Sequence, residues 1–384
     1  MAKYEIVNGV GIIPDGETTI MKEAFKGCKE LTSVVIPSSV TDIGFYAFQY
    51  CSNLESITIP KNVVTIPSNA FAGCHNLKHI VVEDGNPNYD SRDNCNAIIR
   101  GDTLMRGCVN TIIPNGVKAI GWGAFSGVDL TEIVIPEGVE KIDNEAFCYC
   151  ENLKSISIPK SVIEIRTQLT FHGCVSLSSI VVEEGNPVYD SRNNCIIENG
   201  KTLILGCCNS VIPEGVEIVG ARAFSHCTGL TKIVLPESLK AIKGYAFANC
   251  TMLSEVVIPE NVEEIEDHAF RNSGLTSITV PAKVKDLSGI FWGCKNLKSA
   301  IVCGKLEEYR SCNVFPFMEC SSLESITFLD CVRYIKDESC TGCKSLKHIY
   351  VPAKKGDYYK KRFVEELHPL IVEMEPVKKS KKKA

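Results

Sequence analysis

Residues 47–60 have the sequence AFQYCSNLESITIP, and variants of this stretch recur from about residue 18 to about residue 352. As a pattern it is A-F-x-x-C-x-x-L-x-x-I-x-I-P, and neighbouring copies usually lie 23 residues apart. A period in the twenties with apolar residues at L-x-x-I-x-I is typical of a leucine-rich repeat solenoid. The pattern leucine occurs twelve times, at Leu31, Leu54, Leu77, Leu130, Leu153, Leu177, Leu230, Leu253, Leu275, Leu297, Leu323 and Leu346.

One copy shows why the pattern predicts a coil. Residues 54–59 alternate apolar and polar side chains in a β-branched stretch, which favours an extended strand. Pro60 ends that strand because proline has no N–H to donate. Residues 63–66 return apolar groups to the core, and Phe71 closes the coil. A single coil cannot bury its own apolar face, so the coils are expected to stack with their strands in parallel.

Two insertions resemble each other closely. Residues 83–95 have the sequence EDGNPNYDSRDNC and residues 183–195 have EEGNPVYDSRNNC, and a Gly-Cys pair follows each of them. One interpretation is a longer coil in which Arg and Asp pair locally while Tyr packs over the turn. The other is a calcium or ligand loop. The spacing lacks the alternating oxygen ligands and the closing Glu of a calcium loop, which favours the first interpretation.

With these motifs the chain resembles the BspA-like leucine-rich repeat proteins, also called the Treponema pallidum type. The insertions are similar to copies common in Bacteroides proteins. The resemblance covers about residues 18–352. It implies a right-handed solenoid of short parallel strands and, for several members, surface display and adhesion to host or bacterial proteins. It implies no fixed set of binding residues.

We therefore predict a β-rich solenoid over residues 1–354, with about 12 regular coils, two longer inserted coils and few helices. Residues 1–17 are expected to form an irregular N-terminal cap, and residues 355–377 a C-terminal cap. Apolar residues at helical spacing predict a helix from Asp357 to Leu367 in that second cap. Residues 378–384 are rich in lysine and are expected to be a flexible, solvated tail.

The pattern weakens before the C-terminal cap. Ala300 replaces an isoleucine, and the Ala-Phe pair is replaced by Pro316-Phe317 and then by Ser339-Cys340. The late coils are therefore expected to be irregular.

Cysteine is abundant, with 20 residues. Free cysteine behaves as a small buried hydrophobe, and that role suits a residue repeated once per coil. The cysteines are therefore predicted to be reduced and structural, as in a reducing compartment. Cys340 and Cys343 form a C-x-x-C motif. Cys343 is the pattern cysteine and Cys340 takes the phenylalanine position, which favours packing over redox chemistry or metal binding. Ten cysteines occupy the same pattern position: Cys28, Cys51, Cys74, Cys150, Cys174, Cys227, Cys250, Cys294, Cys320 and Cys343.

Net charge, hydropathy and the lack of catalytic motifs limit the classes of function expected for the protein. The formal net charge of −5 gives no basic field for nucleic acid, and no apolar run reaches the roughly 18 residues of a transmembrane helix. No catalytic motif is present, so a non-enzymatic monomer without cofactor or metal is expected. The first residues lack the layout of a secretory signal, which predicts a cytoplasmic protein as the chain is written. A leader ahead of residue 1 would instead make it a surface or secreted protein.

The outward positions of the pattern strands are the candidate binding surface. They are poor in charge and rich in short β-branched groups, which is unusual for an uncovered face. Strand propensity alone could also account for them. We expect a protein-interaction scaffold, with a bacterial surface adhesin as its most specific form and a cytoplasmic structural or interaction repeat protein as the alternative. The candidate contacts to a protein partner are Ser155, Ser157, Ser179, Val181, Lys232, Val234, Glu255 and Val257.

Overall fold

The computed structural model describes residues 3–166, 169–304, 315–330 and 337–375. The tail predicted for residues 378–384 lies outside them. The chain forms two compact units, Met1–Ile196 and Ile197–Ala384, and each is described by itself. The described residues form a leucine-rich repeat β-solenoid of about 15 turns with few helices, which confirms the predicted fold class.

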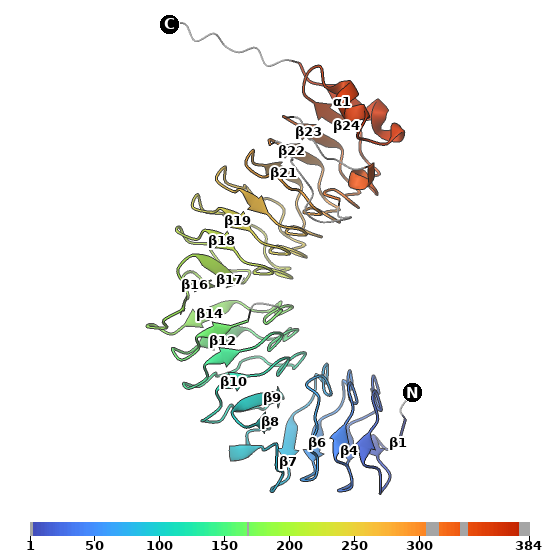
Figure 1. Ribbon diagram of the computed structural model, residues 1–384, viewed down its shortest axis with the longest axis vertical. Coiled ribbons are helices and arrows are strands. Elements are labelled where there is room, and N and C mark those ends of the chain that lie inside the picture. Colours follow the sequence, from blue (N-terminus) through green and yellow to red (C-terminus); the bar gives the residue numbers. More distant parts are fainter. Residues whose placement is uncertain (1–2, 167–168, 305–314, 331–336, 376–384) are drawn as a thin grey trace. The chain divides into compact units, whose positions relative to one another are not determined.

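In unit 1 the pattern strands β2, β4, β6 and β7 pair in parallel, side by side (Figure 1). The return segments form a second set of short strands, among which β9, β10, β11 and β13 are also parallel. The elements of this unit are β1 (Glu5–Val7), β2 (Val10–Ile12), β3 (Thr19–Ile20), β4 (Ser33–Val35), β5 (Asp42–Ile43), β6 (Ser56–Ile59), β7 (His79–Val82), the 3-10 helix η1 (Arg92–Asn94), β8 (Ala97–Arg100), β9 (Thr103–Gly107), β10 (Ala119–Ile120), β11 (Lys141–Ile142), β12 (Ser155–Ile158), β13 (Glu164–Ile165), β14 (Ser179–Val182) and β15 (Tyr189–Asp190).

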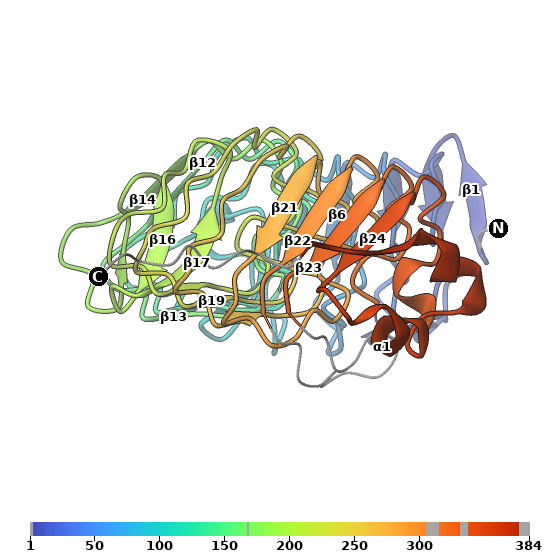
Figure 2. The same cartoon turned by 90° about the horizontal axis from the view of Figure 1, so that it is seen from above.

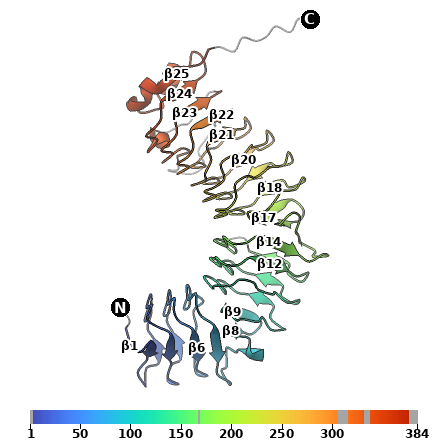
Figure 3. The same ribbon diagram turned by 180° about the vertical axis from the view of Figure 1, so that it is seen from behind.

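Unit 2 repeats the arrangement. Its return strands β17 to β20 follow one another in parallel (Figure 3), and its pattern strands β21 to β24 lie side by side (Figure 2). Strand β16 (Cys195–Glu198) spans the division between the units. The elements of unit 2 are β17 (Thr202–Gly206), β18 (Ile218–Val219), β19 (Ala241–Ile242), β20 (Glu264–Ile265), β21 (Ser277–Val280), β22 (Ser299–Val302), β23 (Ser325–Phe328), the 3-10 helix η2 (Asp337–Cys340), β24 (His348–Val351), α1 (Gly356–Lys360), the 3-10 helix η3 (Glu365–Leu370) and β25 (Ile371–Glu373).

The parallel ladder of pattern strands is not continuous through the described chain. Residues 130–135, 230–235 and 253–258 are not strands, and single bridges join Val134 to Ser157 and Lys232 to Glu255. Two of these coils directly follow an insertion. In this part of the chain the longer hydrogen-bonded ladders lie on the return segments.

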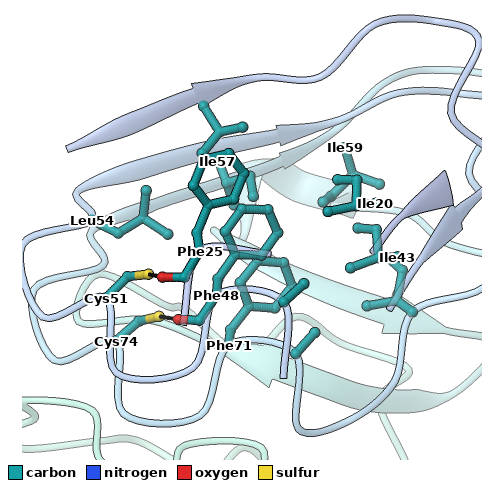
Figure 4. Packing of buried hydrophobic residues seen from close by; sticks show 14 of the residues in the cluster. Ile20, Phe25, Ile43, Phe48, Cys51, Leu54, Ile57, Ile59, Phe71 and Cys74 are labelled. Atoms are coloured by element: carbon teal, nitrogen blue, oxygen red, sulfur yellow. Dashed lines mark hydrogen bonds between the residues drawn. The ribbon is translucent and has the colours of Figure 1, made fainter. Parts of the chain in front are cut away.

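The core is built around a stack of phenylalanine rings. The rings of Phe25, Phe48 and Phe71 are almost parallel, with centroids 5.5 Å and 5.2 Å apart (Figure 4). Phe224 to Phe317 form a column of the same kind within unit 2, with centroids 5.1 to 5.9 Å apart. Each ring therefore covers the face of its neighbour, and no coil can bury its phenylalanine alone.

The pattern cysteine does more than fill space. The Sγ of Cys51 donates to the Phe25 carbonyl oxygen of the preceding coil at 2.9 Å, and Cys74 donates to Phe48 at 3.0 Å (Figure 4). The same carbonyls also accept backbone N–H groups within their own turn, so the thiol uses a second lone pair. Six further copies repeat the bond at 3.0 to 3.2 Å: Cys150, Cys174, Cys250, Cys294, Cys320 and Cys343. All 18 described cysteines are free thiols, as the sequence predicts.

In the inserted coils a glycine takes the place of the phenylalanine. The Gly206 N–H donates to the Ala223 carbonyl at 2.8 Å, just as the Phe48 N–H donates to Ala70 at 2.9 Å. A Cβ on Gly206 would lie 2.1 Å from Cε1 of Phe224, and one on Gly107 would lie equally close to Phe125. The ring of the next coil thus occupies the space that a side chain would need.

The N-terminal cap is a hairpin rather than the irregular coil expected from the sequence. Strands β1 and β2 pair antiparallel around Asn8 and Gly9, both with positive φ. Asn-Gly between apolar residues is the standard signal for such a two-residue turn. Strand β2 then pairs with β4 and begins the parallel ladder.

The C-terminal cap also differs from the prediction. The prediction of one helix from Asp357 to Leu367 is wrong. Helix α1 ends at Lys360, and Val364 is extended, with φ −55° and ψ 150°. The chain leaves the helix so that β25 can pair in parallel with β24. Packing onto the last coil therefore overrides the helical spacing.

The late coils are more regular than predicted. Strands β22, β23 and β24 each have four residues and pair in register. Phe317 stacks on Phe291 although Pro316 precedes it, and Ser339 is fully buried in the alanine position. The substitutions therefore preserve the coil wherever the chain is described.

The thiol–carbonyl bond predicts a difference between two substitutions of Cys250. Cys250→Ala removes both the buried sulfur and the donor to Phe224, and should cost about 2 kcal/mol. Cys250→Ser retains a donor and should cost about 1 kcal/mol less than the alanine variant. Denaturant unfolding followed by circular dichroism measures both, and the half-buried Cys208 provides the control pair. If Cys250→Ser lowers the free energy of unfolding as much as Cys250→Ala does, the thiol stabilises the fold only by filling space.

The ring stack predicts that Gly206→Ala is destabilising by about 1 to 3 kcal/mol through overpacking against Phe224. Gly229→Ala is the matched control, because its added Cβ would have its nearest neighbour, the Cys208 Cβ, at 3.6 Å. That change should alter the free energy of unfolding by no more than about 0.5 kcal/mol. Equal effects of the two substitutions in thermal unfolding would contradict the packing argument.

Candidate functional site

The first part of the candidate surface lies on β12 and β14 in unit 1. These strands pair in register, with Ser155 beside Ser179 and Ser157 beside Val181. Ile156 and Ile158 alternate with them and are buried. The alternation places all four candidate residues of this unit on one outward face. Ser157 and Val181 are exposed, and Ser155 and Ser179 are half-buried.

A valine from the neighbouring coil extends this face. Val134 is bridged to Ser157, so Val134, Ser157 and Val181 form one row across three coils. Val134 is 80% exposed and Val181 is 48% exposed. We call this row, together with Ser155 and Ser179, the unit 1 face.

The second part lies in unit 2 and carries more charge. Lys232 is bridged to Glu255, and Val234 and Val257 follow two residues later in their segments. Both valines are largely exposed, at 63% and 73%. We call these four residues the unit 2 face. The eight predicted contacts thus form two sets, each brought together within its own unit.

Sequence analysis missed two members of these outward rows because they lie in the caps. In unit 1, Ile12 extends the row Val35, Thr58 and Val81, and it is 41% exposed. In unit 2, Val372 extends the row that ends at Tyr350. The Asn8-Gly9 turn could have identified the first of these, since it fixes the register of β2.

The return segments present a different surface. Lysines and glutamates alternate along their ladders and pair with each other: Lys141 lies 3.5 Å from Glu164, and Lys118 pairs with Glu140. In unit 2, Glu217 is held between Lys201 at 2.9 Å and Lys240 at 2.7 Å. These charges are matched within the fold, whereas the apolar groups of the outward rows have no matching cover among the described residues.

The insertions have a structural role that uses their polar residues. Arg92 pairs with Asp90 at 2.6 Å, and Tyr89 is buried with its hydroxyl accepting the Ile66 N–H at 3.0 Å. The second insertion repeats both contacts, with Arg192 on Asp190 at 2.8 Å and Tyr189 accepting from Ile165 at 2.8 Å. These are the local Arg–Asp pair and the packed tyrosine of the first interpretation.

A hollow of about 480 Å³ opens beside the first insertion. It is lined by β7 and by Glu83, Asp84, Ser91, Asn94 and Asn96. Val81, in the outward row, lies at its margin. The insertion therefore forms a concave region beside the otherwise flat outward face.

Comparison with known proteins agrees with this architecture. A family model described as "BspA type Leucine rich repeat region (6 copies)" matches residues 11–95, 103–198, 206–298 and 288–366. The chain belongs to this family. Its leucine-rich repeats are of a kind that is typically non-enzymatic. None of the curated proteins compared with the chain matches it.

Two solved structures of this BspA-type fold are similar over nearly the whole chain. A leucine-rich cell surface protein from Faecalibacterium prausnitzii A2-165 is 24% identical, with a TM-score of 0.61, over 93% of this chain and 91% of that one. The pneumococcal vaccine antigen PcpA is 21% identical, also with a TM-score of 0.61, over 97% and 96%. At these identities the likeness shows the fold alone. In the described part of the chain, no helix is both long and apolar enough to span a membrane.

The charge pairing of the return segments predicts a pH dependence centred on Glu217. Its hydrogen bonds to Lys240 and Lys201 lower the pKa of this carboxyl from 4.5 to about 2. A carboxyl whose pKa is lowered on folding stabilises the protein above its ordinary pKa, and that contribution disappears as the pH falls towards 2.

Glu217→Gln should therefore lower the thermal midpoint at neutral pH but have little effect near pH 2. High salt should shrink the difference, because the pair is exposed. A difference between the wild type and Glu217→Gln that is independent of pH would show that the ion pairs contribute nothing. Thermal unfolding of both proteins across the acid range is the measurement.

Proposed function

We propose that this BspA-type protein is a non-enzymatic scaffold that binds a protein partner through the outward rows of its pattern strands. The observation that carries the proposal is the exposure of short apolar side chains along these rows. Val134, Val234 and Val257 are among the most exposed apolar residues of the described chain. Contiguous exposed apolar surface of this kind marks interaction sites in soluble proteins.

The geometry suits the recognition of a partner that lies across several coils. Successive coils offer one outward residue each, about 4.8 Å apart. Serine and valine side chains have little rotamer freedom to lose, so contact with them costs little conformational entropy. Ser155 and Ser179 add hydroxyl groups that can orient a partner beside the valine row.

The most specific form of the proposal is a bacterial surface protein with an adhesive role. Its support is membership of the BspA-type family, together with the names of two structural relatives, a cell surface protein and a vaccine antigen. Each unit would act as a display surface, with the unit 1 face and the unit 2 face as the contact areas.

The free thiols favour a second candidate, a cytoplasmic structural or interaction protein. The described cysteines are thiols rather than disulfides, and most are buried. Reduced cysteine is the rule in cytosolic proteins, and disulfides are the rule in small secreted ones. Fractionation of the native cells, with antibody detection at the intact surface, distinguishes the two. Protection of the protein from surface labelling would exclude the adhesin.

The binding proposal predicts that lysines introduced on either face weaken the binding of the partner. Val134→Lys with Val181→Lys alters the unit 1 face, and Val234→Lys with Val257→Lys alters the unit 2 face. Burying a lysine in an apolar contact should weaken binding at least about tenfold. The measurement compares partners captured by each full-length variant and by the wild type, followed by titration of the partner retained.

The chain offers matched controls for both variants. Val64 and Ile163 on the return segments of unit 1, and Met252 and Leu329, which lie outside the pattern strands of unit 2, are similarly exposed but lie off the outward rows. The corresponding double lysine variants have the same added charge and should bind like the wild type. If control and face variants lose binding equally, the outward rows are not the binding surface. If neither loses it, the proposal is wrong.

A further inference from the structure

The C-x-x-C motif of residues 340–343 occupies an unusual place in the repeat. Cys343 is the pattern cysteine, and Cys340 fills the position that phenylalanine has in the other regular coils. Its carbonyl accepts the Cys343 N–H at 3.0 Å, as Phe317 accepts from Cys320 at 3.1 Å. The coil therefore keeps the ordinary turn but carries a thiol at both of its ends.

The two thiols are in contact, and that of Cys343 is accessible. Cys340 and Cys343 are hydrogen-bonded through their side chains. Both line a hollow of about 420 Å³ between this turn and the cap segment Val364–Leu367, with Lys344 at its edge. Cys340 is 8% exposed and Cys343 is half-buried, so a reagent in the hollow meets Cys343 first.

We propose that Cys340 and Cys343 form a reversible disulfide by exchange with a low-molecular-weight disulfide such as oxidised glutathione. A turn closed by a hydrogen bond between residues i and i+3 holds their Cα atoms within about 7 Å. Disulfides need about 4.4 to 6.8 Å. Gly342, with φ +81°, gives the turn the freedom to adjust as the bond forms.

The exchange balances in two steps. The Cys343 thiolate attacks one sulfur of glutathione disulfide, forms a mixed disulfide and releases one glutathione thiolate. Cys340 then loses its proton to solvent and attacks the Cys343 sulfur, which releases the second glutathione. Two cysteine thiols are oxidised and one glutathione disulfide is reduced. The hydrogen bond with Cys343, together with burial, raises the pKa of the Cys340 thiol, which fits its role as the second thiol to react.

Oxidation would alter the last coil. In the reduced protein the Cys343 Sγ donates to the Phe317 carbonyl at 3.1 Å. A disulfide sulfur has no proton, so this bond is lost when the disulfide forms. The contact between the coil that contains Phe317 and the next coil, which contains Cys343, therefore depends on the redox state of one pair of cysteines.

The test treats the reduced full-length protein with glutathione disulfide, blocks the remaining thiols after unfolding, and maps the peptides by mass spectrometry. We expect a Cys340–Cys343 link to form at least about tenfold faster than any other cysteine pair. A link that forms first elsewhere, or no link at this turn, would overturn the proposal.

Variants separate the two steps. Cys340→Ser should stop at a stable glutathione adduct on Cys343. Cys340→Phe restores the pattern residue, guards against misfolding of the serine variant, and should also form no link. Cys148→Ser removes one thiol of a closely spaced buried pair and should leave the Cys340–Cys343 link unchanged. Absence of the adduct in both Cys340 variants, if they are folded, would contradict attack by Cys343.

Discussion

In eight of the ten pattern cysteines, the thiol donates to a phenylalanine carbonyl of the preceding coil, and this hydrogen bond joins the two residue types that define the repeat. The phenylalanine ring stacks on its neighbours, and its carbonyl oxygen lies in the buried corner of the coil, as at Phe25 and Phe48. A buried carbonyl has two lone pairs, of which the turn uses one. The thiol supplies a second donor without adding a charge or a bulky group. The same arrangement of ring, carbonyl and thiol can therefore recur from coil to coil.

The packing of the pattern phenylalanine and cysteine explains which parts of the fold can be predicted from the sequence. The repeat period, the inward residues and the free thiols follow from the spacing of Phe48, Cys51 and Leu54, because every copy meets the same packing demands. The donor role of the thiol does not follow, since sequence treats cysteine as a small hydrophobe. Nor does the interruption of the pattern-strand ladder beside residues 130–135, because pairing there depends on the coil that the insertion displaces.

The caps and the candidate site were less predictable for different reasons. Helical spacing at Tyr359 and Phe363 predicted one helix, but those two residues are buried by a short helix and a turn that let β25 reach β24. The outward positions, in contrast, could be aligned from the sequence, and the structure adds their pairing within each unit. Their exposure could not be predicted, because β-branched residues favour strands whether or not a partner covers them.

Tyrosine covers the apolar core at the first coil of unit 1 and at the C-terminal cap of unit 2. The Tyr4 ring lies 5.6 Å from Phe25 at the first coil of unit 1, and Tyr359 lies 5.4 Å from Phe328 beneath the C-terminal cap of unit 2. Their hydroxyls donate to the carbonyls of Thr19 at 3.3 Å and Asp330 at 2.7 Å. A ring covers the apolar end of the core, while a hydroxyl bonds to backbone that no further coil would reach. An aromatic residue with a polar tip is therefore suited to a core surface on which no further coil stacks.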